Sequence, residues 1–228
     1  MSGRTAEAQM TDVRVWVDAA RALAERPGDL VAAVVESTGL STAGVLRALR
    51  RNRETEASDA ELSRLVASAG DAPRVAVVLS ANVFVGALRA IAIARAASTD
   101  VLVRPSRRDP AFARALVEAA ADPAVTLVEE LAIESVPDGE IHVYGRDETI
   151  AEVRARASAR VRVRGHGSGM GVAWISATAD LETAAAALAE DVVAFDQRGC
   201  LSPRIALIEG DGARAAEAAR ALHEALER

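Results

Sequence analysis

The sequence contains no lysine, so arginine supplies all 27 of its strongly basic side chains, and aromatic residues make up only 3% of the 228 positions. We interpret both features as genomic composition bias without functional weight. Only one cysteine is present, which excludes a disulfide framework and any multi-cysteine metal site. The three histidines, at positions 142, 166 and 223, share no ligand spacing, so no metal is expected.

An excess of basic charge is also missing. The formal net charge is -6, and without a basic face to neutralise phosphates we expect no nucleic-acid partner. No apolar run approaches the length of a membrane span, and the N-terminus lacks the charged-then-apolar pattern of a signal peptide. The sequence therefore predicts a cytoplasmic protein. Half of its residues are hydrophobic, which suits one or two compact domains.

The first 70 or so residues have the apolar spacing of helices. One helix is predicted to end at Pro27, and others to begin shortly after Pro27, Ser41 and Ser58. Ser58 and Glu61 have the spacing of a capping box. We expect residues 1–72 to form an N-terminal helical region.

Strands and helices alternate in residues 73–177. Helices of ten or more residues separate most of the strands, which implies right-handed crossovers and a parallel sheet covered on both faces. We therefore predict an α/β fold with a Rossmann-like parallel sheet, followed at residues 178–228 by an incomplete second α/β domain. Ligands of such a sheet bind at the carboxyl ends of its strands. The predicted strands are residues 74–79, 101–103, 125–128, 141–144, 161–163 and 172–175.

The glycine cluster at residues 165–171 does not fit the dinucleotide-binding fingerprint. Met170 stands where the third glycine is required, and a strand rather than a helix is predicted to follow. We interpret the cluster as a bent connection between strands, where the backbone passes close to another part of the protein. A phosphate-facing turn fits better at Gly145 and Arg146, where a strand runs into a helix N-terminus whose free N–H groups attract anions.

The single cysteine, Cys200, lies in a polar segment rather than on an apolar face. Gly199 allows the backbone to approach a bound carbonyl closely, and Arg198 and Arg204 add positive potential that favours the thiolate. A lone cysteine in an intracellular protein is more often a small buried hydrophobe. Residue chemistry alone therefore leaves both interpretations open.

The order of motifs between Pro73 and Arg204 resembles that of the aldehyde dehydrogenase superfamily, and most closely its LuxC-type acyl-CoA reductase branch. The resemblance covers about 130 residues and rests on the collinear set rather than on any single piece. In chain order the pieces are Ser80-Ala81-Asn82, Val103-Arg104-Pro105-Ser106, Val143-Tyr144-Gly145-Arg146, Gly165-His166-Gly167, Thr178-Ala179-Asp180-Leu181 and Gly199-Cys200.

The resemblance implies that the protein reduces a fatty acyl-CoA thioester to an aldehyde through a cysteine acyl-enzyme. Cys200 would be the nucleophile, and the Asn82 side chain would donate a hydrogen bond to the developing oxyanion. The alternative for Asn82, from its local turn chemistry alone, is a plain turn residue.

The resemblance also implies a nicotinamide cofactor. Arg104 stands where the family has a lysine that binds the cofactor ribose, and Ser106 and Arg107 follow it closely. Arginine pairs well with a phosphate, so this loop favours NADP over NAD. Gly145 and Arg146 would face the cofactor phosphates.

One departure from the family pattern concerns hydrolysis. Hydrolytic members carry a glutamate just after the fifth strand, whereas this sequence reads Arg164-Gly165-His166-Gly167 there. A reductase does not need the water that this glutamate activates. His166 could act as an acid or base, although a glycine-flanked histidine is more often structural.

The other departure concerns length. Family members continue far beyond the cysteine, whereas this chain ends 28 residues after Cys200. We therefore expect residues 178–228 to be the start of a catalytic domain, with an apolar face that calls for a homo-oligomer or a completing partner. The alternative to an acyl-CoA reductase is a non-catalytic nucleotide-binding or assembly module of the same fold.

Overall fold

The computed structural model describes residues 4–51, 54–81, 83–167, 169–199 and 202–227. The chain forms two compact units, residues 1–168 and 169–228. This division differs from the boundaries predicted at residues 72 and 177. The N-terminal helices pack within the first unit, and the strand predicted at residues 172–175 belongs to the second.

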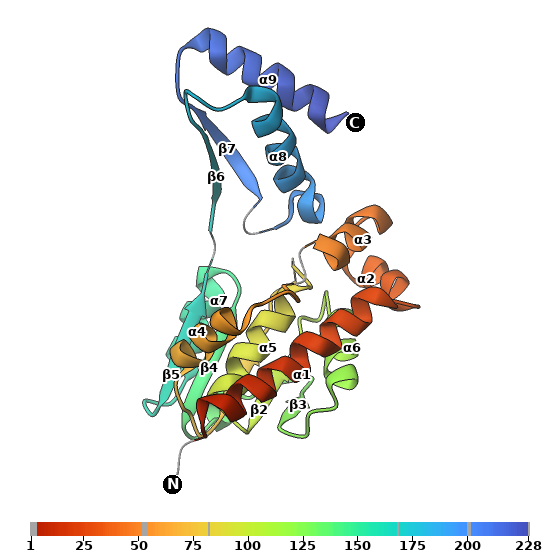
Figure 1. The fold of residues 1–228 in the computed structure, drawn as a ribbon. Coiled ribbons are helices and arrows are strands. Elements are labelled where there is room, and N and C mark those ends of the chain that lie inside the picture. Colours follow the sequence, from red (N-terminus) through yellow and green to blue (C-terminus); the bar gives the residue numbers. More distant parts are fainter. Residues whose placement is uncertain (1–3, 52–53, 82, 168, 200–201, 228) are drawn as a thin grey trace. The chain divides into compact units, whose positions relative to one another are not determined.

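The first unit is built around a five-stranded sheet with the strand order β3-β2-β1-β4-β5 (Figure 1). Every neighbouring pair of strands is parallel, which confirms the predicted α/β class. The polar ends of β4 and β5 extend these two strands beyond their predicted bounds. The strands are β1 (Val75–Val78), β2 (Val101–Arg104), β3 (Val125–Leu127), β4 (Gly139–Tyr144) and β5 (Val161–His166).

Helices cover both faces of this sheet. Helices α5 (Gly86–Ala97) and α6 (Ala111–Ala120) connect β1 to β2 and β2 to β3, and α7 (Asp147–Arg156) connects β4 to β5. The strands joined by α5 and α6 lie on one side of β1, and those joined by α7 lie on the other side. Right-handed crossovers therefore place α7 on the face of the sheet opposite α5 and α6. The core on the α7 face joins strand residues to α7 and to the short helix η1 (Ile133–Ser135), and includes Ala76, Val78, Ile141, Val143, Ile150 and Val153.

The N-terminal helices form an outer layer on the α5 and α6 side. Helix α1 (Ala6–Glu25) runs across α5 and α6, α2 (Leu30–Thr38) packs against α3 (Thr42–Arg51) and α6, and α4 (Asp59–Ala69) packs against α1 and α5 (Figure 1). Among the described residues no single helix has the length and hydropathy of a membrane span. Helices α2 and α3 reach that threshold only when taken together, and a bend of 116° separates them.

The predicted helix starts are confirmed in two places. The Ser41 hydroxyl accepts a hydrogen bond from the Gly44 backbone N–H at 3.0 Å. Ser58 and Glu61 form the reciprocal capping box that their spacing predicts. Each cap satisfies backbone N–H groups that have no partner within the helix.

A buried arginine network fastens α1 to the sheet. Arg95 of α5, only 7% exposed, places Nε 2.7 Å from Asp122 Oδ2 and Nη1 2.9 Å from Asp12 Oδ2. Trp16 Nε1 also donates to Asp122, and Arg4 pairs with Asp12. Burial alone raises the pKa of Asp122, but hydrogen bonds from Ala124 N–H and Arg95 outweigh it and leave that pKa below its ordinary value. The carboxylate is therefore held in its charged form.

Replacing Arg95 with methionine is expected to lower the free energy of unfolding by about 3–5 kcal/mol, because Asp122 and Asp12 lose their buried cation. Urea unfolding followed by circular dichroism measures the loss. Arg14→Met is the matched control, since its pair with Asp59 is solvent-exposed and is worth less than about 1 kcal/mol. Equal losses in the two variants would show that the network is not what fastens α1.

The second unit pairs β6 (Gly171–Ile175) with β7 (Pro203–Ile208) in a two-stranded parallel sheet. The sixth predicted strand therefore forms, but not beside β5 as its assignment to residues 73–177 implied. Its inward side chain Ile175 instead joins a core made with α8 (Leu181–Val193) and α9 (Gly212–Leu226). Short helix η2 (Ala194–Gln197) follows α8.

Candidate functional site

The carboxyl edge of the five-stranded sheet gathers most of the predicted cofactor residues. Strand β1 lies between β2 and β4, so the turns after these three strands leave the same edge. From β1 the chain adds β2 and β3 on one side of the sheet, and it then returns to add β4 and β5 on the other side. The strand order therefore reverses between β1 and β4, which is where an open α/β sheet binds its ligand. Arg104 at the end of β2 and Gly145 after β4 flank the turn that follows β1. The predicted oxyanion donor Asn82 lies outside the described residues.

The end of β2 carries a cation open to a ligand. Arg104 is half-buried, and its guanidinium makes no hydrogen bond or ion pair with any residue that the structure describes. Arg107 is exposed and pairs with Glu130 at 2.8 Å. The Ser106 hydroxyl accepts a hydrogen bond from the Arg108 backbone N–H at 3.3 Å. Arg104 and Ser106 could therefore bind an anionic group directly, whereas Arg107 must first release Glu130.

The same loop ends at a buried carboxyl group that the sequence reasoning missed. Asp109 is 5% exposed, and neither of its carboxyl oxygens has a hydrogen-bond partner within the described part of the chain. Burial raises the pKa of Asp109 to about 7. Its backbone pairs with Ser106 as an isolated bridge. The loop that follows Arg104 therefore contains an acid that ionises near neutral pH.

The turn after β4 offers a helix N-terminus with mixed electrostatics. Arg146 is the N-terminal cap residue of α7, and its own side chain makes no capping hydrogen bond to the first N–H groups of the helix. These groups favour an anion. Asp147 and Glu148 occupy the first turn of α7, and their negative charges disfavour an anion there. Gly145 and Arg146 therefore fit a phosphate less well than Arg104 does.

The glycine cluster is a close approach of backbone to α7, as interpreted from the sequence. A Cβ atom at position 165 would lie 2.6 Å from Ile150 Cγ2, and one at position 167 would overlap Asp147 Oδ1. Strand β5 ends at His166 and β6 begins at Gly171, and none of the residues described between them is helical. Because side chains alternate along a strand, His166 projects to the face opposite α7.

His166 lies flat on Tyr144 at the carboxyl edge. The two rings are stacked, with centroids 4.3 Å apart and planes 5° apart. His166 is exposed, and partial burial together with the charge of Arg164 lowers its pKa. The Tyr144 hydroxyl is buried without a partner among the described residues, and burial raises the pKa of Tyr144 to about 12. The edge therefore presents a neutral imidazole beside a protonated phenol at neutral pH.

A buried ionic group lies beneath this pair on the same face. Arg164 Nη2 donates to Glu140 Oε1 at 2.8 Å and to the Ala69 carbonyl at the end of α4 at 3.4 Å, and His142 Nε2 lies 2.9 Å from Glu140 Oε2. Burial lowers the pKa of His142. Burial raises the pKa of Glu140, but the hydrogen bonds from Arg164 and His142 outweigh it and keep that pKa low.

The strand register explains this column of polar groups. Glu140, His142 and Tyr144 of β4 lie opposite Arg162, Arg164 and His166 of β5. The sequence signal was available, since polar residues alternate at the same period in both strands. Within the described part of the chain, no group of three histidine, cysteine or acidic side chains is arranged to hold a metal ion.

The segment before the cysteine has an unusual backbone. Phe195, Asp196 and Gln197 have φ angles of 54°, 49° and 61°, a left-handed conformation that non-glycine residues rarely adopt. The Gly199 carbonyl then accepts a hydrogen bond from the Ser202 backbone N–H at 3.1 Å. Cys200 itself lies outside the described residues. Strained backbone of this kind gathers at functional sites, where the surrounding structure enforces it.

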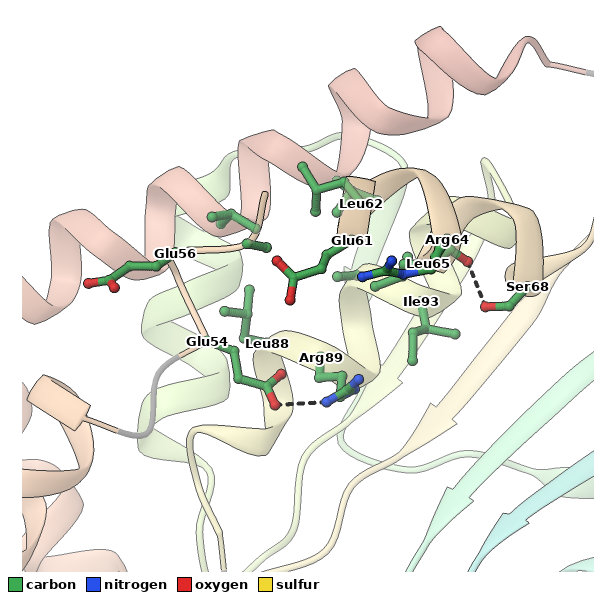
Figure 2. A pocket seen from close by; sticks show the side chains of 14 residues that line it. Glu54, Glu56, Glu61, Leu62, Arg64, Leu65, Ser68, Leu88, Arg89 and Ile93 are labelled. Atoms are coloured by element: carbon green, nitrogen blue, oxygen red, sulfur yellow. Dashed lines mark hydrogen bonds and ion pairs between the residues drawn. The ribbon is translucent and has the colours of Figure 1, made fainter. Parts of the chain in front are cut away.

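A groove of about 700 Å³ lies elsewhere in the first unit, between α1, α4, α5 and the segment before α4 (Figure 2). Leu62, Leu88 and Ile93 line it, and the Glu54–Arg89 ion pair of 2.8 Å lies at its side. None of the predicted site residues lines this groove. It is therefore not part of the candidate site.

Solved structures share this fold although few of their residues are identical to those of this chain. An NAD-dependent benzaldehyde dehydrogenase from Corynebacterium glutamicum is 16% identical with a TM-score of 0.74, over 99% of this chain and 55% of that one. An acetylating aldehyde dehydrogenase from Geobacillus thermoglucosidasius is 17% identical with a TM-score of 0.69, over 97% and 54%. An NADP-dependent glyceraldehyde-3-phosphate dehydrogenase from Bacillus halodurans is 15% identical with a TM-score of 0.68, over 98% and 53%. The chain thus spans about half the length of these proteins.

The fold places the chain among proteins of aldehyde dehydrogenase architecture. The family can be stated more closely, because the model of the acyl-CoA reductase (LuxC) family matches residues 70–228. The chain belongs to the LuxC acyl-CoA reductase family. No curated protein matches its sequence.

A prediction follows from the buried carboxyl of Asp109. Its folded pKa of about 7 exceeds the ordinary 3.8, so its stability cost is absent at low pH, grows as the pH rises toward 7 and is constant above it. The free energy of unfolding of Asp109→Asn, relative to that of the native chain, should therefore rise by about 2–3 kcal/mol from pH 5 to pH 8, because each pH unit below 7 changes it by about 1.4 kcal/mol. Urea unfolding at the two pH values measures the difference. The exposed Asp138→Asn is the control, and an identical pH dependence in both variants would refute the assignment.

Proposed function

We propose that this protein takes part in the NADPH-dependent reduction of a fatty acyl-CoA thioester to an aldehyde, with Cys200 as the nucleophile. The family match over residues 70–228, which includes the cysteine segment, is the observation that carries the proposal. The left-handed backbone at residues 195–197 supports it, because a cysteine that only fills space needs no strained approach.

The reaction needs few groups from the protein. The Cys200 thiolate attacks the thioester carbonyl, a C–S bond forms, and CoA leaves as a thiolate that takes up a proton. A bound nicotinamide supplies the hydride that reduces the acyl carbon. The C–S bond to Cys200 then breaks, which releases the aldehyde and restores the thiolate. Asn82 and the Cys200 backbone N–H stabilise the oxyanion in both steps.

Release as the free acid is not expected. In the hydrolytic relatives that this chain resembles, a glutamate after the fifth strand activates water, and here the corresponding residues are Arg164 to Gly167. The carboxyl tip of β5 instead carries the exposed imidazole of His166, which is stacked on Tyr144. Product analysis should therefore give aldehyde rather than acid.

The cofactor preference is carried by the loop after β2. The open guanidinium of Arg104 and the hydroxyl of Ser106 are suited to a ribose phosphate, and Arg107 adds a second cation when it leaves Glu130. Among the similar structures, one is described as NAD-dependent and another as NADP-dependent, so the architecture serves either cofactor. The three arginines of residues 104–108 favour NADPH in this chain.

The first prediction of this proposal concerns acyl transfer. Incubation with palmitoyl-CoA should add one acyl group to the protein, and Cys200→Ser should abolish the adduct that hydroxylamine removes. Asn82→Ala should slow its formation by about a hundredfold, because one oxyanion donor is lost. A time course of intact mass measures both effects, with Asn82→Asp as a variant that keeps the side-chain size but loses the NH2. Equal rates in all three asparagine-site proteins would remove Asn82 from the mechanism.

The second prediction concerns the cofactor. NADPH should raise the melting temperature of the protein more than NADH does, and Arg104→Ala should remove that difference. Arg114→Ala is the control, because this α6 arginine pairs with Glu129 on the surface. Thermal shift at matched nucleotide concentrations is the measurement. Equal shifts from both nucleotides in the native protein would refute the NADPH preference.

The alternative is a nucleotide-binding or assembly module without turnover. The chain spans about half the length of the similar solved structures, which is the observation that favours it. Nucleotide-induced stabilisation without any acyl adduct would support this alternative.

A further inference from the structure

The imidazole of His166 presents an open aromatic surface at the carboxyl edge of the five-stranded sheet. One side of its ring lies against the Tyr144 ring, with centroids 4.3 Å apart and planes 5° apart. The two residues are register partners on β4 and β5, and the Gly145 backbone N–H donates to the His166 carbonyl at 3.2 Å. His166 is exposed although Tyr144 covers one side of it, so its other side is accessible. We call these two stacked rings the His166 platform.

The platform is uncharged at neutral pH. Partial burial and the charge of Arg164 lower the pKa of His166, and burial raises the pKa of Tyr144 to about 12. The Tyr144 hydroxyl has no partner among the described residues, so no hydrogen bond of that hydroxyl orients the ring beneath His166. Histidine and tyrosine rings stack on the flat heterocycles of nucleotides. The platform is therefore suited to a flat ring rather than to an anion.

The position of the platform selects one end of a dinucleotide. The strand order β2-β1-β4-β5 places His166 three strands away from Arg104. Neighbouring strands are about 4.8 Å apart, so about 14 Å of sheet edge separates the two residues. In the proposed cofactor site, Arg104 binds the phosphate on the adenosine ribose. A dinucleotide extended along the edge from Arg104 then brings its nicotinamide ring to the platform.

We infer that the His166 platform stacks on the nicotinamide ring and binds its oxidised form more tightly than its reduced form, an inference that rests on the proposed NADPH site. The nicotinamide ring is neutral in NADPH and carries a positive charge in NADP⁺. The face of an aromatic ring attracts a cation, and a neutral ring lacks this attraction. Arg104 cannot supply the same discrimination, because the ribose phosphate is identical in both forms.

The charges near the platform do not reverse this preference. Arg164 lies on the same strand as His166, and its positive charge is matched by Glu140, whose Oε1 accepts from Arg164 Nη2 at 2.8 Å. Arg89 of α5 acts on Tyr144 and forms an ion pair of 2.8 Å with Glu54. The platform therefore favours the product form of the cofactor, which favours hydride donation to the acyl carbon and slows the release of NADP⁺.

Isothermal titration of NADP⁺ and NADPH at pH 8 tests the inference on the native chain and two variants. His166→Leu removes the ring from an exposed position, and His166→Phe keeps a flat ring. His166→Leu should weaken NADP⁺ binding about tenfold and NADPH binding by about threefold at most, because leucine keeps an apolar contact but does not attract a cation. His166→Phe should restore the native preference for NADP⁺.

A fragment of the cofactor separates the two ends of the site. Adenosine 2′,5′-bisphosphate has the ribose phosphate of NADP but no nicotinamide. His166→Leu should leave its binding unchanged, whereas Arg104→Ala should weaken it. His223→Leu is the matched control, because this histidine is exposed on α9 of the second unit, and it should leave the binding of all three ligands unchanged. Unchanged circular dichroism shows that each variant is folded.

Four results would overturn the inference. Equal weakening of NADP⁺ and NADPH in His166→Leu would refute the preference for the oxidised ring. Weaker binding of the fragment in His166→Leu would assign the platform to the adenosine end. Fragment binding that depends on Arg104, together with NADP⁺ binding that is indifferent to His166→Leu, would refute the platform and keep the proposed cofactor site. Failure of the native chain to bind any of the three ligands would refute both.

Discussion

The buried guanidinium of Arg95 is the interaction on which the first unit depends. Arg95 lies on the crossover helix α5 and is only 7% exposed, so its charge must be matched by carboxylates that other elements bring to it. Asp12 comes from α1, and Asp122 comes from the turn before β3. These contacts fix the N-terminal layer, the crossover helix and the edge of the sheet relative to one another. They also explain why residues 1–72 do not stand apart as a region of their own.

The same kind of constraint shapes the carboxyl edge. Glu140 is buried between strands, and it stays charged because Arg164 and His142 surround it. Arg164 also reaches the last turn of α4, so the ionic group joins the sheet to the outer helical layer. Tyr144 and His166 lie above it, at the edge where an α/β sheet presents its ligand site. These charged contacts link the strands beneath the edge to one another and to α4.

Local patterns predicted most of the secondary structure because each depends on neighbouring residues only. The Ser58–Glu61 capping box and the apolar strands of the sheet are examples. The partner of β6 was not predictable from its own four apolar residues, since only the α8–α9 core decides which sheet it joins. Asp109 gave no sequence signal, because an acid before a proline is ordinarily an exposed turn residue. The alternating polar residues of β4 and β5 could be recognised in the sequence. Their burial could not, because it depends on packing against α4.

The central claim is that Cys200 forms a thioester with the substrate, and peptide mapping tests it most directly. The native protein is treated with one equivalent of palmitoyl-CoA, digested without thiols and analysed by tandem mass spectrometry. The account predicts a single palmitoyl group on the peptide that contains Cys200, attached at the sulfur and released by hydroxylamine. An unmodified Cys200 peptide, or a palmitoyl group on another side chain such as Ser202, would contradict it.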